Sequence, residues 1–424
     1  MRKFLAGLLG MVLCVQTVYG IPVRAADVFE PGERPKAMQD VIRQEDPEQT
    51  NRDNSGNLTG LELSAESAVI MEASGGQVLL EKNADEKKPP ASVTKVMTLL
   101  LIFDALADGT ITPDTEVTTS EYAASMGGSQ VFLEAGEKQT VDTMIKCLAV
   151  ASANDACVAM AEKIAGSEPA FVEKMNQRSA GLGMTNTHFV NCNGLDTEGH
   201  LTTARDIALM SRELITKYPQ IEDYSTIWME NITHTTAKGS SEFGLSNTNK
   251  LIRFYPGATG LKTGFTSGAG YCLSATAERE GMELIAVVMG CETSQKRTAA
   301  CKSMLDYGFA GYTLVQPDLQ EPVRVPVILG KAEDVPLELS QPEGILIEKG
   351  QKTKITFEAA PEAEIKAPVE KGQVLGTLTV KAEGHAVKEI PLVASRAVDR
   401  LRWSDLFVLV LRRAAMAKPE TETE

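Results

Sequence analysis

The chain has 424 residues, 43% of them hydrophobic and 23% charged, a composition that fits two or three globular domains and excludes collagen, a coiled coil or wholesale disorder. The formal net charge of −15 argues against a nucleic-acid partner, because phosphate binding needs a concentrated basic surface. With four histidines and 5% aromatic residues, the chain has little material for a site built on several imidazoles or on base stacking.

Residues 1–26 have the pattern of a secretory signal peptide. Two basic residues precede a mostly apolar stretch at 4–18, and Ala25 and Ala26 follow as small residues for cleavage. The alternative is an uncleaved anchor helix, but the apolar stretch is shorter than the roughly 20 residues that span a bilayer. Residues 27–59 are polar and acidic without an apolar period, and they predict a flexible linker. We therefore expect an exported protein.

Six cysteines lie beyond the predicted signal peptide, and none has a C-x-x-C spacing. They are Cys147, Cys157, Cys192, Cys272, Cys291 and Cys301. An exported protein can pair its cysteines, but isolated cysteines in apolar surroundings are more often small core residues. We expect mostly free, buried thiols, no metal site and no cofactor.

Residues 60–315 predict an α/β domain, in which helices pack against one sheet. Apolar runs at 67–72 and 78–81 flank a Ser-Gly-Gly turn and predict a hairpin. A run from Val93 to about Asp108 is apolar on nearly every side, which is typical of a helix in the middle of a core. Further helical and strand patterns follow at 141–165, 204–217, 271–277 and 282–289.

The helical signal ends after about residue 315. Short alternating runs separated by Pro and Gly predict a small all-β sandwich domain at 316–396. Residues 397–424 predict an amphipathic helix and tail, with Trp403 and a pair of arginines around six apolar residues. Such a helix can lie in a membrane interface, although it cannot span a bilayer. The alternative is a helix that packs on the β domain.

Ser92 and Lys95 form an S-x-x-K segment at the start of the predicted core helix. Residues three apart share a helix face, so the Lys95 amine can reach the Ser92 hydroxyl. A serine is a weak nucleophile until a base takes its proton, and lysine serves as that base when burial and a nearby cation keep it neutral. Taken alone, the segment also fits an exposed Ser and Lys in a first helical turn.

Ser152-Ala153-Asn154 lies where one predicted helix ends and the next begins. Ser152 can relay a proton between a lysine and a leaving group, and Asn154 can orient a substrate amide or the lysine. As an isolated tripeptide the segment would indicate a helix cap.

Lys262-Thr263-Gly264 enters a predicted strand. Glycine weakens a strand unless another backbone approaches closely, and a substrate peptide added along this edge would need such room. Lys262 would supply the second cation near Lys95, and Thr263 a hydroxyl for a carboxylate. The alternative is an ordinary turn into a strand.

The three motifs in this order resemble those of penicillin-binding proteins and class A β-lactamases. The closer resemblance is to the low-molecular-mass, serine-type D-alanyl-D-alanine carboxypeptidases of the peptidase S11-like family, over about residues 60–416. Longer shared strings support it: P-P-A-S at 89–92, S-A-N-D-A at 152–156, N-G-L-D at 193–196, T-A-R-D at 203–206 and G-L-K-T-G-F-T at 260–266. The resemblance implies a β-lactamase/transpeptidase-like catalytic domain followed by the β-sandwich domain and the terminal helix.

The resemblance also implies roles for individual residues. Ser92 corresponds to the acylated nucleophile and Lys95 to its general base. The candidate catalytic residues are Ser92, Lys95, Ser152, Asn154 and Lys262. The candidate substrate-binding residues are Lys262, Thr263, Gly264, Phe265 and Arg297. The backbone N–H groups of Ser92 and Phe265 match the oxyanion hole, and Arg297 matches an arginine that holds the terminal carboxylate, unless it is a solvated helix charge.

The chain departs from the family pattern at two positions. Ala153 stands where glycine or aspartate is commoner, and Phe265 stands where some members carry histidine. The E-x-x-L-N segment of class A β-lactamases is missing between the second and third motifs. Since its glutamate activates the deacylating water, we do not expect efficient β-lactam hydrolysis.

These features predict an exported serine carboxypeptidase that removes the terminal D-alanine from peptidoglycan stem peptides and is acylated by penicillin at Ser92. Its expected partners are stem peptides, β-lactam antibiotics and, through the terminal helix, the outer face of the cytoplasmic membrane. The alternatives are a β-lactamase or esterase on the same scaffold, and a catalytically silent penicillin-binding sensor.

Overall fold

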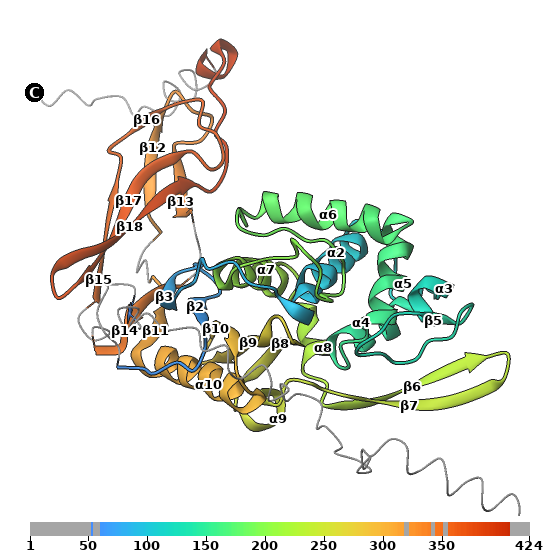
Figure 1. Cartoon of the computed structure of the whole chain (residues 1–424). Helices are drawn as coiled ribbons and strands as arrows, with labels where there is room; N and C mark the ends of the chain where they lie inside the picture. Colours follow the sequence, from blue (N-terminus) through green and yellow to red (C-terminus); the bar gives the residue numbers. More distant parts are fainter. Residues whose placement is uncertain (1–51, 54–59, 318–321, 341–343, 351–354, 408–424) are drawn as a thin grey trace, which may run out of the picture. The chain divides into compact units, whose positions relative to one another are not determined.

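The computed structural model describes residues 52–53, 60–317, 322–340, 344–350 and 355–407 (Figure 1). The predicted signal peptide, most of the predicted linker and the end of the predicted terminal helix lie outside these residues.

The first domain is built on a six-stranded antiparallel sheet. Its strand order is β1-β3-β2-β10-β9-β8. The strands are β1 (Arg52–Asp53), β2 (Ser67–Glu72), β3 (Val78–Lys82), β8 (Ala258–Thr266), β9 (Gly270–Arg279) and β10 (Met282–Cys291). The predicted hairpins 67–81 and 271–289 are confirmed as β2–β3 and β9–β10. Strand β8, which carries the third motif, is at the edge of the sheet.

Strand β1 corrects the sequence analysis, which placed residues 52–53 in a flexible linker. Arg52 and Asp53 pair with Glu81 and Leu80 of β3. Such an edge pairing is made by backbone groups and needs no apolar period in the sequence, so hydrophobic patterning gives no sign of it.

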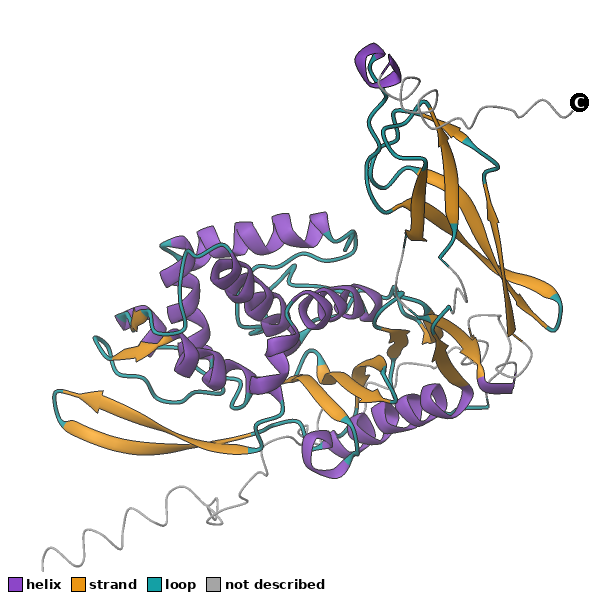
Figure 2. Cartoon of the chain, turned by 180° about the vertical axis from the view of Figure 1, so that it is seen from behind, coloured by secondary structure: helices purple, strands orange, loops and turns teal. Residues whose placement is uncertain are grey.

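The two faces of the sheet bury two separate hydrophobic layers. Along β10, Ile285 and Val287 belong to one layer, and Leu284 and Ala286 belong to the other. This alternation follows from the two-residue period of a strand. Helix α10 (Ser294–Gly311) packs on β9 and β10 on one side, and α7 (Ala204–Lys217) packs on β2 and β10 on the other (Figures 1 and 2).

The predicted all-apolar helix is confirmed as α2 (Lys95–Ala107), preceded by the 3₁₀ turn η2 (Ala91–Thr94). Its residues from Lys95 to Phe103 are all buried. The helix therefore lies within the core, with α4 (Val141–Ala149), α5 (Asn154–Ala165) and α7 packed around it.

The predicted helical segments at 141–165 and 204–217 are also found, the first as α4 and α5 with a break at 150–153. The remaining elements of this domain were not predicted. They are α3 (Glu121–Ala124), α6 (Glu168–Gly181), η3 (Pro219–Ile221), α8 (Glu222–Ser225), α9 (Leu251–Phe254), the β4–β5 pair (Glu116–Thr118, Lys138–Thr140) and the β6–β7 hairpin (Met229–Thr236, Gly239–Ser246).

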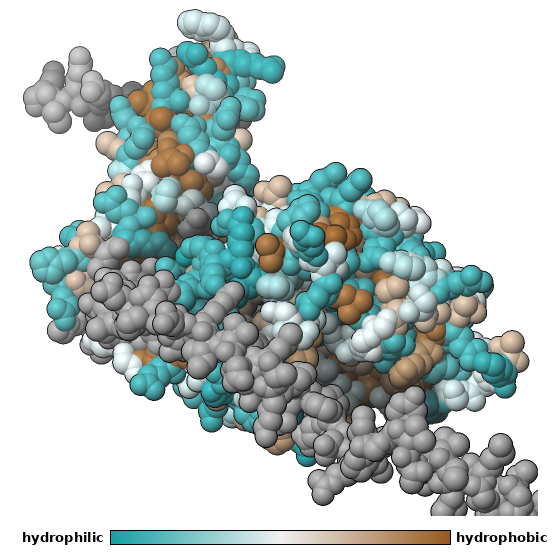
Figure 3. Space-filling model, viewed as in Figure 1, coloured by the Kyte–Doolittle hydropathy of each residue, from teal (hydrophilic) through white to brown (hydrophobic). Residues whose placement is uncertain are grey.

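The later part of the chain is β-rich, as predicted. Its six-stranded sheet has the order β15-β17-β18-β13-β12-β16. The strands are β12 (Arg324–Ile328), β13 (Asp334–Leu339), β15 (Ile355–Pro361), β16 (Ile365–Lys366), β17 (Val374–Ala382) and β18 (His385–Ala394). A separate pair joins β11 (Tyr312–Val315) to β14 (Ile345–Glu348). On the face seen in Figure 3, hydrophobic residues of this part form small patches among hydrophilic ones.

Residues 403–407 form a helical turn in which Trp403 is 89% exposed and Phe407 is 66% exposed. No helix in the described part of the chain is both long and apolar enough to cross a bilayer. The six cysteines are free and buried, as expected.

Truncating Leu100 should destabilise the first domain. Its side chain is completely buried on α2, so Leu100→Ala should lower the free energy of unfolding by about 2–5 kcal/mol. Denaturant unfolding monitored by circular dichroism measures the change. Leu106→Ala, at a partly buried position on the same helix, is the control and should cost less. Equal losses in the two variants would show that α2 is not the centre of the core.

Candidate functional site

The Lys95 amine lies beside the Ser92 hydroxyl at the junction of η2 and α2. The distance from Lys95 Nζ to Ser92 Oγ is 3.1 Å. Nζ is also 2.6 Å from Asn154 Oδ1 and 2.7 Å from the carbonyl oxygen of Asn193. The predicted base and nucleophile are thus in hydrogen-bond contact, and the predicted second-motif asparagine touches the same amine.

The surroundings of Lys95 favour the uncharged amine. The side chain is completely buried, and this desolvation lowers its pKa, against smaller opposing contributions from Cys157, Cys192 and Asp155. A neutral amine has two N–H groups and one lone pair. Its two N–H groups match the oxygens of Asn154 and Asn193, which leaves the lone pair for the Ser92 O–H.

The second motif contacts Lys95 through Asn154, the first residue of α5. Asn154 donates through Nδ2 to the carbonyl of Gly127 at 2.6 Å, and its backbone N–H donates to the carbonyl of Ser129 at 2.7 Å. Its side-chain oxygen is therefore held toward Lys95. Ser152 has a φ of 61°, and its buried Oγ has no hydrogen-bond partner among the described residues. A buried hydroxyl without a partner is available to a substrate or to a transferred proton.

The third motif lies against the nucleophile turn. A Cβ on Gly264 would be 3.0 Å from both the Pro90 carbonyl oxygen and the Val93 nitrogen. The glycine is therefore required by a close backbone approach, as predicted, but the approaching backbone is the chain's own turn at 90–93. Among the strands that the structure describes, none pairs with the outer edge of β8.

Lys262 and Thr263 are buried on the same strand. Burial lowers the pKa of Lys262 well below its usual value, and repulsion from Lys95 and Arg297 lowers it further. The Lys262 amine donates to the Thr263 carbonyl at 3.2 Å. The Thr263 hydroxyl is 2.6 Å from the hydroxyl of Thr248, a contact that the sequence analysis missed.

Arg297 lies inside the structure, and the interpretation of it as a solvated helix charge is wrong. Its Nη1 donates to the carbonyls of Gly264 at 3.3 Å and Cys272 at 3.4 Å, and its guanidinium lies 5.6 Å from the centre of the Tyr271 ring. The side chain braces β8 against β9 directly behind the third motif. Phe265 follows on β8, with its ring 4.3 Å from that of Tyr271.

Asn193 and Gly194 lie within the shared string at 193–196, but no role in the site was predicted for either of them. Asn193 acts through its backbone carbonyl, so its side-chain type carries no signal for this role. Gly194 has a φ of 90°, and a Cβ there would be 1.9 Å from the carbonyl oxygen of Ala91. The loop at 193–194 thus packs directly on the residue before Ser92, a contact that the shared N-G-L-D string does not by itself reveal.

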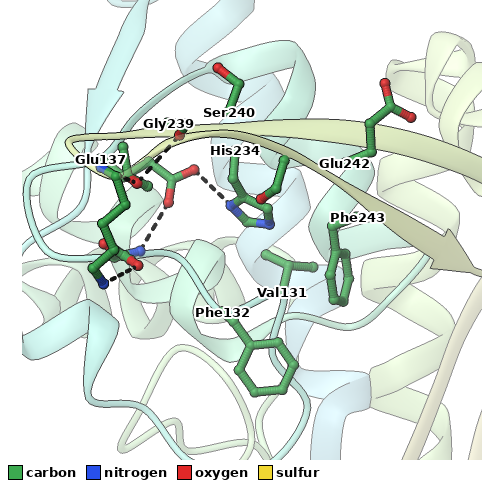
Figure 4. Close-up of a pocket in the computed structure, with 12 residues that line it drawn as sticks. Val131, Phe132, Glu137, His234, Gly239, Ser240, Glu242 and Phe243 are labelled. Carbon is green, nitrogen blue, oxygen red and sulfur yellow. Dashed lines mark hydrogen bonds and ion pairs between the residues drawn. The ribbon is translucent and has the colours of Figure 1, made fainter.

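A cavity of about 370 Å³ lies away from these motifs, between the loop at 131–137 and the β6–β7 hairpin (Figure 4). Phe132 and Phe243 meet edge to face at its wall, and Glu137 Oε1 is 2.8 Å from His234 Nδ1. Its lining includes no residue of the three motifs.

In the described part of the chain, no cluster of three or more His, Cys, Asp or Glu side chains could hold a metal ion.

Comparison with known families and proteins identifies relatives over both domains. Residues 51–293 match the family described as D-alanyl-D-alanine carboxypeptidase (peptidase S11), and residues 312–400 match the C-terminal domain of penicillin-binding protein 5. The chain is 45% identical to D-alanyl-D-alanine carboxypeptidase DacF of Bacillus subtilis over 339 residues, 79% of this chain and 86% of the relative.

Further relatives agree with this match. D-alanyl-D-alanine carboxypeptidase DacA of Escherichia coli is 34% identical over 346 residues, which cover 80% of this chain and 84% of the relative. The solved structure of penicillin-binding protein 5 from Haemophilus influenzae superposes with a TM-score of 0.71 at 30% identity, covering 81% of this chain and 100% of that one.

Acylation of Ser92 should depend on pH through the Lys95 amine. The neutral base accumulates as pH rises through the lowered pKa, so the acylation rate should rise and then level off below pH 10.5, the ordinary value for lysine. Stopped-flow measurement with a chromogenic acylating agent gives this profile. Lys95→Gln keeps a polar side chain but cannot accept a proton, and it should give a low, flat profile. If the acylation rate of the wild type keeps rising through pH 10.5, as expected for a base with the ordinary lysine pKa, the assignment of Lys95 as a base with a lowered pKa is wrong.

Proposed function

Because the chain belongs to the peptidase S11 family of serine-type D-alanyl-D-alanine carboxypeptidases, we propose that it removes the terminal D-alanine of peptidoglycan stem peptides through an acyl-enzyme on Ser92. The protein is a carboxypeptidase of cell-wall metabolism. The observation that carries the mechanistic proposal is the contact between the Ser92 hydroxyl and a buried lysine amine at 3.1 Å.

Acylation begins with the transfer of the Ser92 hydroxyl proton to Lys95 Nζ. The Ser92 oxygen then forms a bond to the carbonyl carbon of the penultimate D-alanine. The oxyanion accepts hydrogen bonds from the backbone N–H groups of Ser92 and Phe265. As the C–N bond breaks, the leaving amine takes the proton from Lys95, with the free Ser152 hydroxyl as relay, and D-alanine departs.

Deacylation repeats the sequence with water in place of the serine. Lys95 takes a proton from the water as it attacks the ester carbonyl, and returns it to the Ser92 oxygen as the C–O bond breaks. Lys95 is the base in both half-reactions, so both acylation and deacylation require its amine to be uncharged.

The substrate lies along the free edge of β8. A peptide added antiparallel to this strand would use main-chain hydrogen bonds for affinity, as other strand-binding proteins do. The Thr263 hydroxyl, supported by Thr248 at 2.6 Å, donates to the terminal carboxylate of this peptide. The buried Arg297 guanidinium supplies positive potential behind it, and the Lys262 amine is a hydrogen-bond donor on the same strand.

Replacing Ser92 by alanine should abolish both labelling by fluorescent penicillin and release of D-alanine from a diacetyl-Lys-D-Ala-D-Ala peptide. The reason is that this change removes the oxygen that forms the ester. Ser340→Ala, at an exposed position in the β-rich domain, is the control and should keep both activities.

Labelling that persists in Ser92→Ala would remove Ser92 from the mechanism. Wild-type protein that is labelled but releases no D-alanine would indicate a penicillin sensor. Cephalosporin turnover near the median enzyme rate of about 10 per second would indicate a β-lactamase.

We also propose that the protein is exported and attaches to the outer face of the cytoplasmic membrane through its terminal amphipathic segment. The large exposure of Trp403 and Phe407 supports an interfacial contact, since such side chains are otherwise costly to leave in water. The rest of the predicted helix lies outside the described residues.

The double variant Trp403→Ser/Phe407→Ser should bind anionic lipid vesicles more weakly than the wild type, because two apolar contacts are lost. Vesicle co-sedimentation of the mature chain measures the bound fraction. Ile328→Ser, which removes a partly exposed apolar side chain from the β-rich domain, is the control. Unchanged binding in the double variant would favour packing of the helix on protein.

A further inference from the structure

His200 is a buried histidine outside the three motifs. It is 2% exposed, and both of its ring nitrogens have hydrogen-bond partners. The backbone N–H of Val190 donates to Nδ1 at 2.9 Å. Because Nδ1 is an acceptor, the ring proton of the neutral imidazole is on Nε2, and Nε2–H donates to the Thr94 hydroxyl at 2.8 Å.

Thr94 connects His200 to the turn at residues 91–94, which carries Ser92. Its hydroxyl donates to the carbonyl oxygen of Ala91 at 2.8 Å. Ala91 has a φ of 48°, which is rare for a residue with a side chain, and it immediately precedes Ser92. Two linked hydrogen bonds therefore hold the turn that presents Ser92 in this uncommon conformation. The first joins Ala91 to Thr94, and the second joins Thr94 to His200.

The other side of the ring contacts the loop that holds the base. Three residues after Val190, Asn193 accepts the hydrogen bond from Lys95 Nζ at 2.7 Å. Gly194 in the same loop packs on the Ala91 carbonyl. His200 thus joins two segments: the loop that orients Lys95 and the turn that orients Ser92.

We infer that His200 is a positioning residue that couples these two segments through Thr94, so that the Ser92 oxygen and the Lys95 nitrogen stay within proton-transfer distance. This inference rests on the proposed function of the same site. His200 touches neither Ser92 nor Lys95 in any described hydrogen bond, and it acts through Thr94 and the loop backbone.

The coupling requires a neutral imidazole with an acceptor on one side and a donor on the other. The pKa of His200 is lowered to about 4, mainly by burial and in smaller part by repulsion from His188, while Asp196 opposes the shift. The ring of Phe189 packs edge to face on it at 5.8 Å. A charged ring would place a proton against the Val190 N–H, so the neutral form keeps the loop contact at working pH.

Thr94→Val is the sharpest test, because it removes the hydroxyl and keeps the shape of the side chain. Losing a buried hydrogen bond should lower kcat/KM for D-alanine release by about ten- to hundredfold with little change in KM. Thr94→Ser keeps the hydroxyl and should stay within about threefold of the wild type. Tyr218→Phe, which removes a hydroxyl bonded to Asp104 at the far end of α2, is the control for a purely structural loss and should leave kcat/KM unchanged.

The pH profile separates positioning from mere stability. A loosened turn lets water reach Lys95, so the acid limb of kcat/KM should move to higher pH in Thr94→Val and in His200→Leu. Thr94→Val combined with His200→Leu should be no worse than either single variant, because both break one chain of contacts. If His200→Leu does not fold, the comparison of Thr94→Val with Thr94→Ser still tests the inference.

Wild-type kcat/KM and an unmoved acid limb in Thr94→Val would overturn the inference, as would equal losses in Thr94→Ser. The rate of penicillin acylation, read in parallel, distinguishes this failure from failure of the proposed function. If the wild type releases no D-alanine but still acylates, the positioning effect on Ser92 can be read from acylation alone.

Discussion

Desolvation of the Lys95 amine is the constraint on which this site depends. A buried cation is costly unless it is paired, and the buried Lys88 shows the usual solution, with carboxylates of Glu66 and Glu86 at 2.8 and 2.7 Å. The hydrogen-bond partners described for Lys95 are instead a hydroxyl, an amide oxygen and a backbone carbonyl. These partners satisfy the hydrogen-bonding groups of a neutral amine, and none of them is a carboxylate that would stabilise a charged one. A neutral amine is the form that can take the proton from a serine hydroxyl. Burial of α2 on every side is therefore part of the chemistry as well as of the fold.

Close backbone contacts bring the three motifs together around this amine. Gly264 lets β8 lie against the turn at 90–93, and Gly194 lets the loop after Asn193 lie against Ala91. A side chain at either position would push the approaching segment away from the Ser92 turn. The geometry of the pair is thus set by contacts between backbones far apart in sequence, which side-chain motifs alone do not reveal.

Much of the fold was predictable because strong periodic patterns decide it. The core helix, the two hairpins and the β-rich second domain follow from apolar runs and turn residues, and the motif order pointed to Ser92, Lys95 and Asn154. Other features carry no such pattern. The edge strand β1 forms through backbone pairing, and Asn193 contributes a carbonyl that any residue has. His200 and Thr94 matter through hydrogen bonds that only the folded chain creates. Arg297 was predicted as a carboxylate ligand, and its observed contacts brace Gly264 and Cys272 from behind.

The protonation state of Lys95 in the resting protein tests the central claim most directly. In protein carrying [ε-¹³C]lysine, the ¹³Cε resonances of Lys95 and Lys262 can be assigned with Lys95→Met and Lys262→Met and then followed by NMR as pH is changed. Both resonances should titrate below 10.5, the ordinary pKa of a lysine side chain. A Lys95 resonance that titrates at or above 10.5 would show a charged amine beside Ser92, and the mechanism built on a neutral base would then be wrong.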